Sequence, residues 1–218
     1  MNTGLKMWGN VVCAFLLMVG CGTSDETSAD SSSESSVLLD SAVLDVNIPV
    51  SGLNLEGVLH LPERVEGEPV SGIVLVHGSG ANSRDHVAGL QFNMYFRGVE
   101  VMAFSDIAQA LQTAGYAVLR YDKRNCGTFN ELCTNSYPVP QTDITVTDFM
   151  DDAVAAVQWL IANTAVDADK VFVAGLSQGG EMMPAILDAE PGLAGGVSLA
   201  GNWRPVDELL RYQLDFSR

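Results

Sequence analysis

One serine stands in a sequence context that suits a nucleophile. Ser177 is the central residue of Gly175-Leu176-Ser177-Gln178-Gly179, which matches the pattern G-x-S-x-G. In that pattern the chain leaves a strand, turns sharply and enters a helix, so that the serine hydroxyl stands clear of the sheet. The turn requires small residues two positions before and two positions after the serine, and Gly175 and Gly179 meet this requirement. The pattern therefore predicts that Ser177 is the nucleophile of an acyl-transfer or hydrolysis reaction.

Attack of a serine on an acyl carbon needs two further kinds of group. The hydroxyl needs a base, normally a histidine held by a carboxylate, and the developing oxyanion needs N–H donors. We expect these donors to be the main-chain N–H groups of Gln178, directly after the serine, and of Ser79 in the motif His77-Gly78-Ser79-Gly80. The two glycines allow that backbone to approach closely. We interpret His77 and the hydroxyl of Ser79 as features of the loop.

Hydrophobic patterns around these motifs predict strands that alternate with helices. Alternating apolar positions at 42–50 and 53–61 predict two antiparallel strands joined near Ser51. A short, wholly apolar run predicts a strand at 72–76 that is buried on both faces. Two further buried strands are predicted at 117–121 and 195–199, and a strand at 170–175 leads into the turn before Ser177. Helices are predicted at 106–114 with Ser105 as the cap, along a stripe from 149 to 161, at 181–189, and after Pro205. This order indicates an α/β fold with a doubly wound, mostly parallel sheet, in which ligands bind where strands end.

Three segments together resemble the α/β-hydrolase superfamily in order and spacing. They are V-H-G-S-G, G-Y-A-V-L-R-Y-D-K-R and G-L-S-Q-G-G, and the later L-A-G-N-W-R-P-V-D-E-L-L is similar as well. The resemblance extends from Asp45 to the last residue and favours exported bacterial serine hydrolases related to serine aminopeptidases and dienelactone-hydrolase-like esterases. It implies serine-dependent acyl hydrolysis without a cofactor, through Ser177. In such folds Asp122 and Arg124 lie on a loop near the site, and we interpret them as a structural ion pair first and as substrate contacts second.

The histidines depart from the pattern of this family. The family's catalytic residues follow the order serine, carboxylate, histidine along the chain, whereas His60, His77 and His86 all precede Ser177. We therefore expect a chain that is truncated relative to the family, with its sheet incomplete at the C-terminal edge. Such a chain would lack the acid and the base and would be inactive alone. Two alternatives remain open, a rearranged triad that uses His86 or His77 and a chain that has lost catalysis.

The first residues carry the pattern of an export signal. An apolar run at 11–19 is too short to span a bilayer. It ends in the sequence Leu17-Met18-Val19-Gly20-Cys21, which resembles a bacterial lipobox with Met18 in place of the usual leucine. We predict a lipoprotein signal peptide at 1–20 and lipidation of Cys21. The alternative is an ordinary secretory signal that is cleaved near Gly20 or Gly22.

The next segment has the composition of a tether. Residues 21–36 begin with the cysteine and continue with serine, threonine and acidic side chains. Such a segment buries too little apolar surface to fold, and it suits a flexible link between a lipid anchor and a domain. We predict a partial α/β-hydrolase domain at 42–218, an exported, membrane-anchored protein, and the outer membrane as its site if the cell has one, because Gly22 follows the cysteine.

Charge argues against a nucleic-acid partner. The formal net charge is −16, with 11 basic and 27 acidic side chains, and only Arg120, Lys123 and Arg124 lie close together among the basic residues. Phosphate binding requires clustered cations. We therefore expect no nucleic-acid partner, a small-molecule ester or amide as the substrate, and contact with the membrane through the lipid anchor, while the oligomeric state stays open.

Two of the four cysteines belong to the predicted domain. Cys126 and Cys133 are seven positions apart, and an exported protein meets an oxidising compartment in which such a pair can form a disulfide. The alternative is two free thiols. No metal is expected, because two cysteines without a nearby histidine are an incomplete ligand set.

Two functions are compatible with these features. The first is a lipid-anchored serine hydrolase that cleaves carboxylic esters or peptide-like amides through an acyl-enzyme at Ser177. The alternative is a non-catalytic binding lipoprotein with a degenerate hydrolase pocket. Specificity would come from the loops at 81–103 and 125–142. The first loop is rich in large apolar side chains, which we expect to pack against the core: Phe92, Met94, Tyr95, Phe96 and Val101.

Overall fold

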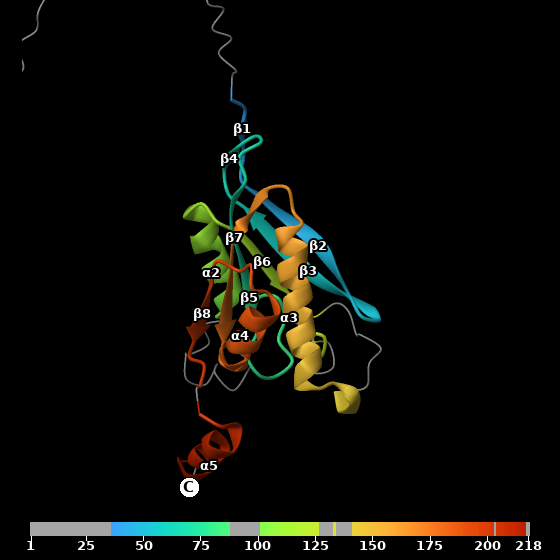
Figure 1. The fold of residues 1–218 in the computed structure, drawn as a ribbon, viewed down its shortest axis with the longest axis vertical. Coiled ribbons are helices and arrows are strands. Elements are labelled where there is room, and N and C mark those ends of the chain that lie inside the picture. Colours follow the sequence, from blue (N-terminus) through green and yellow to red (C-terminus); the bar gives the residue numbers. More distant parts are fainter. Residues whose placement is uncertain (1–35, 88–100, 127–132, 134–140, 203, 217–218) are drawn as a thin grey trace, which may run out of the picture. The chain divides into compact units, whose positions relative to one another are not determined.

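A six-stranded mixed sheet forms the centre of the protein in the computed structural model (Figure 1). Its order is β2-β3-β6-β5-β7-β8. Only β2 against β3 and β3 against β6 are antiparallel, so the predicted α/β fold with a mostly parallel sheet is confirmed. The strands are β2 (Ala42–Val50), β3 (Leu53–Leu61), β5 (Val70–Val76), β6 (Ala117–Tyr121), β7 (Val166–Leu176) and β8 (Gly195–Leu199). A separate pair joins β1 (Leu38–Leu39) and β4 (Arg64–Val65).

The structure describes residues 36–87, 101–126, 133, 141–202 and 204–216. The predicted signal peptide, Cys21 and all but the last residue of the tether lie outside these ranges, as do the four aromatic and methionine side chains at positions 92–96. The described helices are α2 (Ala103–Thr113), α3 (Val146–Ile161), α4 (Gln178–Ala189), α5 (Val206–Phe216) and a 3₁₀ turn, η1 (Gln141–Asp143). Within those ranges, none of the helices has the length and apolar character needed to cross a bilayer.

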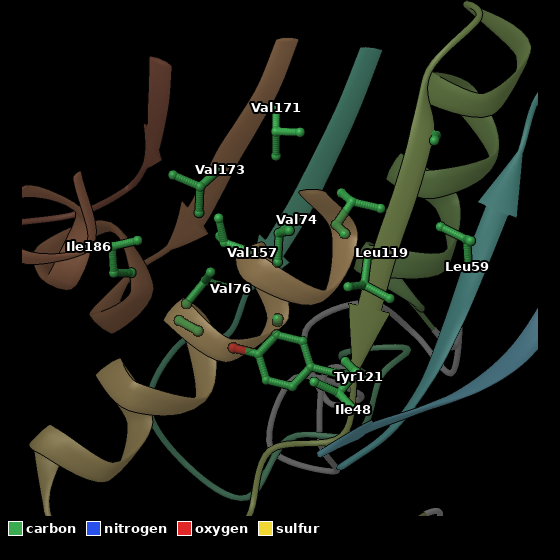
Figure 2. Packing of buried hydrophobic residues seen from close by; sticks show 14 of the residues in the cluster. Ile48, Leu59, Val74, Val76, Leu119, Tyr121, Val157, Val171, Val173 and Ile186 are labelled. Carbon is green, nitrogen blue, oxygen red and sulfur yellow. The ribbon is translucent and has the colours of Figure 1, made fainter. Parts of the chain in front are cut away.

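Helices cover both faces of the sheet, as the alternation along β5 shows. Val74 and Val76 pack toward α3 and α4, with Val157 and Ile186 in the same buried cluster (Figure 2). Leu75 points to the opposite face and packs against Phe104 of α2. A strand that is buried on both sides has no polar face, which explains why its sequence is a continuous apolar run.

Several element boundaries differ from the prediction, and the starts of α2, β7 and α4 differ most. Helix α2 starts at Ala103 with Met102 as its N-cap and no side-chain cap bond, so Ser105 lies in the first turn instead of at the cap. The earlier start allows Phe104 to be fully buried, and this burial outweighs a single cap bond. Strand β7 begins at Val166, four residues before the predicted start. Helix α4 begins at Gln178 because the two glycines that follow the serine belong to its first turn.

Helix α4 contains a proline that leaves one carbonyl without a helical donor. Pro184 has no N–H, so the carbonyl of Gly180, four residues earlier, receives no bond from it. The hydroxyl of Ser198, in β8, donates to that carbonyl at 3.4 Å. The neighbouring strand therefore satisfies the acceptor that the proline leaves open.

Candidate active site

Ser177 occupies a strained turn between β7 and α4. Its backbone has φ 52° and ψ −112°, a conformation that non-glycine residues rarely adopt. Its N–H donates to the carbonyl of Leu199 in β8 at 2.8 Å, and its carbonyl accepts the N–H of Glu181 at 3.0 Å. These two bonds hold the strained residue from both sides, and the residue is only half-buried. The turn therefore places Ser177 directly after the end of β7 in a strained conformation, and such strain is commonly associated with function.

Glycines on each side of the serine allow this turn to close. A Cβ atom at Gly175 would overlap the backbone of Gly179, and a Cβ atom at Gly179 would overlap the carbonyl oxygens of Val76 and His77. The start of α4 thus lies directly on the end of β5. No residue larger than glycine fits at either position without moving the backbone.

The two N–H groups that the sequence suggested as oxyanion donors belong to segments that meet at this turn. The N–H of Gln178 belongs to the first turn of α4, where no helical carbonyl is available to accept it. The loop after β5 lies against the sharp turn at residues 175–179, which we call the elbow. A Cβ atom at Gly78 would be 3.3 Å from Cβ of Ser177. Ser79, the next residue, is exposed and carries the second expected N–H donor.

The side chain of Asn82 organises this loop. Its amide nitrogen donates to the carbonyls of Gly78 (3.0 Å), Ser79 (2.9 Å) and Gly80 (3.4 Å). In a trans peptide the C=O and the following N–H point in opposite directions. The loop therefore turns its carbonyls toward Asn82 and its N–H groups away from it.

Lys123 is the residue of this site that the sequence did not reveal. Its ammonium donates to the carbonyl of Gly78 and to Oε1 of Gln178, both at 2.8 Å, and lies 4.1 Å from the ring centroid of Phe149. Burial lowers the pKa of Lys123 to about 8. In the sequence it was only one member of a small group of basic residues at the end of β6 and just after it.

His77 anchors the loop and is not placed as a base. Its Nε2 donates to the carbonyl of Tyr121, which leaves Nδ1 unprotonated and, in the described structure, buried without a partner. Burial lowers the pKa of His77 to about 3, against the opposing effect of the bond to Tyr121. The ring stacks on Phe104, with centroids 5.0 Å apart. The geometry agrees with a loop role for this histidine.

His86 and Ser177 flank the same glycine. A Cβ atom at Gly78 would lie 3.7 Å from Cε1 of His86 and 3.3 Å from Cβ of Ser177. The His86 ring stacks on Phe104 with centroids 4.8 Å apart, and its backbone has φ 48°. Its Nδ1 is buried and has no hydrogen-bond partner within the described residues. Burial, and then the charge of Lys123, lowers the pKa of His86, so the ring is neutral near pH 7.

His60 belongs to a different part of the fold. Its Nε2 accepts from Arg120 at 3.0 Å, so Nδ1 carries the proton and donates to Oε1 of Gln112 at 3.1 Å. Arg120 in turn pairs with Asp85. These partners join α2 to β3 and β6, and they give His60 a structural role.

The predicted ion pair between Asp122 and Arg124 is wrong. Asp122 pairs with Arg84, which donates to its two oxygens from Nε at 3.1 Å and from Nη2 at 2.8 Å. Arg124 pairs with Asp152 of α3. Asp122 and Arg124 thus pair with residues that are 38 and 28 positions away along the chain. Local sequence patterns do not contain information about such distant pairs.

The structure joins Cys126 and Cys133 in a disulfide, and both cysteines are buried. Asp122 lies beside them, with a carboxylate oxygen within 4.8 Å of the sulfurs. Both oxygens of this carboxylate accept hydrogen bonds from Arg84. The three residues are thus arranged as a disulfide beside an ion pair.

A small hollow of about 10 Å³, with room for about one water molecule and partly open to solvent, lies next to the site. Ser177 does not line it, so it differs from the cleft that the elbow would serve. Its lining residues are Val76, His77, Tyr121, Lys123, Phe149, Asp152 and Met182.

Comparison with known proteins assigns the family. Residues 73–217 match the Alpha/beta hydrolase family. The chain belongs to this family. Among curated proteins, this α/β-hydrolase is 35% identical over 172 residues to Esterase EstD of Thermotoga maritima, and the match covers 78% of this chain and 35% of EstD. The chain therefore spans about a third of the length of that relative.

Solved structures support the same fold at low sequence identity. The α/β-hydrolase GrgF from a Penicillium species has a TM-score of 0.55 at 20% identity, with 81% of this chain and 52% of GrgF covered. A dienelactone hydrolase from Anabaena variabilis has a TM-score of 0.51 at 24% identity, with 75% and 65% covered. The acylaminoacyl peptidase of Pyrococcus horikoshii has a TM-score of 0.53 at 19% identity, with 75% and 24% covered.

Proposed function

We propose that this α/β-hydrolase is a serine hydrolase that cleaves carboxylic esters, or peptide-like amides, through an acyl-enzyme at Ser177. The observation that carries this proposal is the strained turn with φ 52°, in which the half-buried Ser177 directly precedes the N–H of Gln178 in the first turn of α4. The relation to a protein named as an esterase supports ester substrates.

Each step of the proposed reaction has a defined place in this geometry. The Ser177 Oγ attacks the acyl carbon and gives its proton to a base, and the N–H groups of Gln178 and Ser79 bind the resulting oxyanion. The alcohol then leaves with a proton, and water hydrolyses the acyl-enzyme to release the acid. The residues after Ser177 in this sequence include no histidine, and His86 and Ser177 both approach the position that a Cβ atom of Gly78 would occupy. Our proposal therefore assigns the nucleophile and the oxyanion donors, and it assigns no residue as the base.

The test uses the protein expressed from its complete reading frame. We expect hydrolysis of p-nitrophenyl butyrate and labelling of Ser177 by a fluorophosphonate, located by mass spectrometry. Ser177→Ala should abolish the labelling and lower kcat/KM by at least about 10³-fold. Ser51→Ala, in the exposed turn between β2 and β3, is the matched control and should leave both unchanged. Equal rates for Ser177→Ala and the unmodified protein would favour the non-catalytic binding lipoprotein instead.

We further propose that the protein is exported and held at the membrane by a lipid on Cys21. Support comes from the apolar run at 11–19, the lipobox-like sequence that ends at Cys21, and the polar segment that follows it. The expressed protein should incorporate labelled palmitate and partition into the detergent phase of Triton X-114. Cys21→Ser should shift it to the aqueous phase, and partition that is unaffected by this substitution would exclude the anchor.

A further inference from the structure

A single buried ammonium connects the two segments that carry the proposed oxyanion donors. Lys123 follows β6 and is 3% exposed. Its Nζ donates to the carbonyl of Gly78 in the loop after β5 and to the side-chain oxygen of Gln178 at the start of α4, each at 2.8 Å. Among the described residues, Lys123 has no carboxylate within ion-pair distance. Its charge is therefore satisfied by two neutral oxygens and by the face of the Phe149 ring.

The bond to Gly78 acts directly on the N–H of Ser79. The carbonyl of Gly78 and the N–H of Ser79 belong to one planar peptide group, so fixing the oxygen fixes the opposite direction of the N–H. Asn82 contributes a second bond to the same oxygen at 3.0 Å. A positive donor on the carbonyl also polarises the peptide, which makes its N–H a stronger hydrogen-bond donor.

The bond to Gln178 fixes the other segment. The side chain of Gln178 accepts from the ammonium, while its main-chain N–H remains available in the first turn of α4. Lys123 therefore sets the position of the loop after β5 relative to the elbow through one atom. None of the other described basic side chains bonds to both segments.

We propose that Lys123 is a positioning residue, whose ammonium holds the Ser79 peptide and Gln178 in register so that both N–H groups face one oxyanion beside Ser177. The positional part of this inference rests on the contacts of Lys123 alone. Its effect on catalysis rests on the function proposed above.

Stability alone does not account for a lysine at this position. Removing an ammonium from water without a carboxylate partner is costly, and an apolar side chain of similar length would avoid that cost. The lowered pKa of Lys123 reflects the same cost. Lys123→Met should therefore unfold in urea at the same or a higher concentration than the unmodified protein, even though the loop has lost its anchor.

Hydrogen–deuterium exchange of the full chain tests the positional part without any need for turnover. With Lys123→Met we expect exchange at least about tenfold faster in peptides that cover residues 77–84 and 175–183, because local opening becomes easier there. Lys170→Met is the matched control, since it removes an exposed lysine whose described ion pair joins it to Asp167. An exchange pattern for Lys123→Met that matches the control in both segments would overturn the proposal.

Kinetics of the protein from its complete reading frame test the effect on catalysis. Lys123→Met should lower kcat for p-nitrophenyl butyrate by about 10- to 100-fold and leave KM within about twofold. The reason is that the N–H groups of Ser79 and Gln178 would bind a charge that develops only in the transition state. Lys123→Arg keeps the positive donor and should recover part of the loss. If Ser177→Ala abolishes activity and Lys123→Met does not lower it, the catalytic role of Lys123 is excluded. If Ser177→Ala is fully active, the proposed function fails while the exchange experiment still decides the positional role.

The pH profile adds a signature that a purely structural residue would lack. The titratable groups facing Lys123 are His77, His86, Asp152 and Tyr121. Burial lowers the pKa values of the two histidines and raises those of Tyr121 and Asp152, whereas burial lowers the pKa of Lys123 to about 8. We expect kcat to fall as the pH rises through about 8 in the unmodified protein, and this decline should be absent in Lys123→Met. The same decline in both proteins would contradict a role for the charge.

Discussion

Arg124 and Asp152 form a two-pronged ion pair that fastens the segment after β6 to helix α3. Nε of Arg124 lies 2.7 Å from one carboxylate oxygen, and Nη2 lies 2.5 Å from the other. Both side chains are almost fully buried. A second carboxylate, that of Asp148, accepts from Nη1 at 3.0 Å. Because Lys123 directly precedes Arg124, this pair also fixes the backbone from which the Lys123 ammonium reaches the site.

Removing one partner of this buried pair should strongly destabilise the fold. Asp152→Ala leaves a buried guanidinium with an incomplete partner set, and we expect the free energy of unfolding to fall by about 3–5 kcal/mol. The neighbouring Asp151 is exposed, so Asp151→Ala should change it by less than about 0.5 kcal/mol. Urea denaturation followed by circular dichroism measures both variants. Equal midpoints for the two variants would show that the pair contributes no net stability.

Enlarging a glycine of the elbow should disturb the turn. At Gly179 a methyl group would overlap the carbonyl oxygens of Val76 and His77, so Gly179→Ala should cost at least about 2 kcal/mol of stability. The matched control is Gly192→Ala, because a Cβ atom there meets nothing within 4 Å. We expect the control to unfold within about 0.5 kcal/mol of the unmodified protein in thermal or urea scans. A well-tolerated Gly179→Ala would show that the turn can relax.

Burial of His77 should make the protein sensitive to acid. Its pKa is about 3 in the fold and 6.5 in the unfolded chain, so below pH 6.5 the unfolded state binds a proton that the fold excludes. The contribution of His77 to the free energy of unfolding is constant above pH 6.5. As the pH falls from 6.5 toward 3, the free energy of unfolding decreases by up to about 1.4 kcal/mol per pH unit.

His77→Gln keeps a donor for the carbonyl of Tyr121 and does not titrate in this range. The variant should therefore lose less stability than the unmodified protein between pH 7.5 and pH 4.5, when urea midpoints are compared at the two values. Identical losses in both proteins would mean that His77 is protonated within the fold.

The disulfide should add stability that a reductant removes. The bond between Cys126 and Cys133 closes a loop in the unfolded chain and so restricts its conformations. For a loop of this length, the restriction raises the free energy of unfolding by about 2 kcal/mol. Reduction with tris(2-carboxyethyl)phosphine should lower the melting temperature of the unmodified protein. The double variant Cys126→Ser, Cys133→Ser should melt at the lower temperature with or without reductant. A melting temperature that does not respond to reductant in the unmodified protein would indicate free thiols.

Much of the fold could be predicted from the sequence because its signals are local. The runs at β5 and β6 are buried as predicted, and the glycines around Ser177 indicate a turn that only small residues allow. The prediction that β8 is buried is wrong, because this strand is at least partly exposed throughout and Val197 is 50% exposed. The start of α2 was mispredicted because a favourable cap residue, Ser105, was weighed above the burial of Phe104. Burial of a single large side chain depends on the tertiary structure, which the local pattern does not contain.

The polar contacts of the site could not be predicted in the same way. The partner of Asp122 comes from the loop after β5, and the partners of Lys123 come from two elements that lie 45 and 55 positions away. Arg124 lies close to Asp122 along the chain and suggested a local ion pair. In the fold, each of the two residues pairs with a residue on another element. The role of His77 could be predicted, because its position directly after a strand already favoured a loop function.

The bond between Ser198 and Gly180 has a consequence for the evolution of this protein. A proline at position 184 and a hydroxyl at position 198 complement each other, since one leaves open the acceptor that the other fills. Homologous chains with any other residue at position 184 have an amide of their own for that carbonyl and no need for serine at 198. The two positions should therefore vary together across relatives, and reverting the proline should relax selection on the serine.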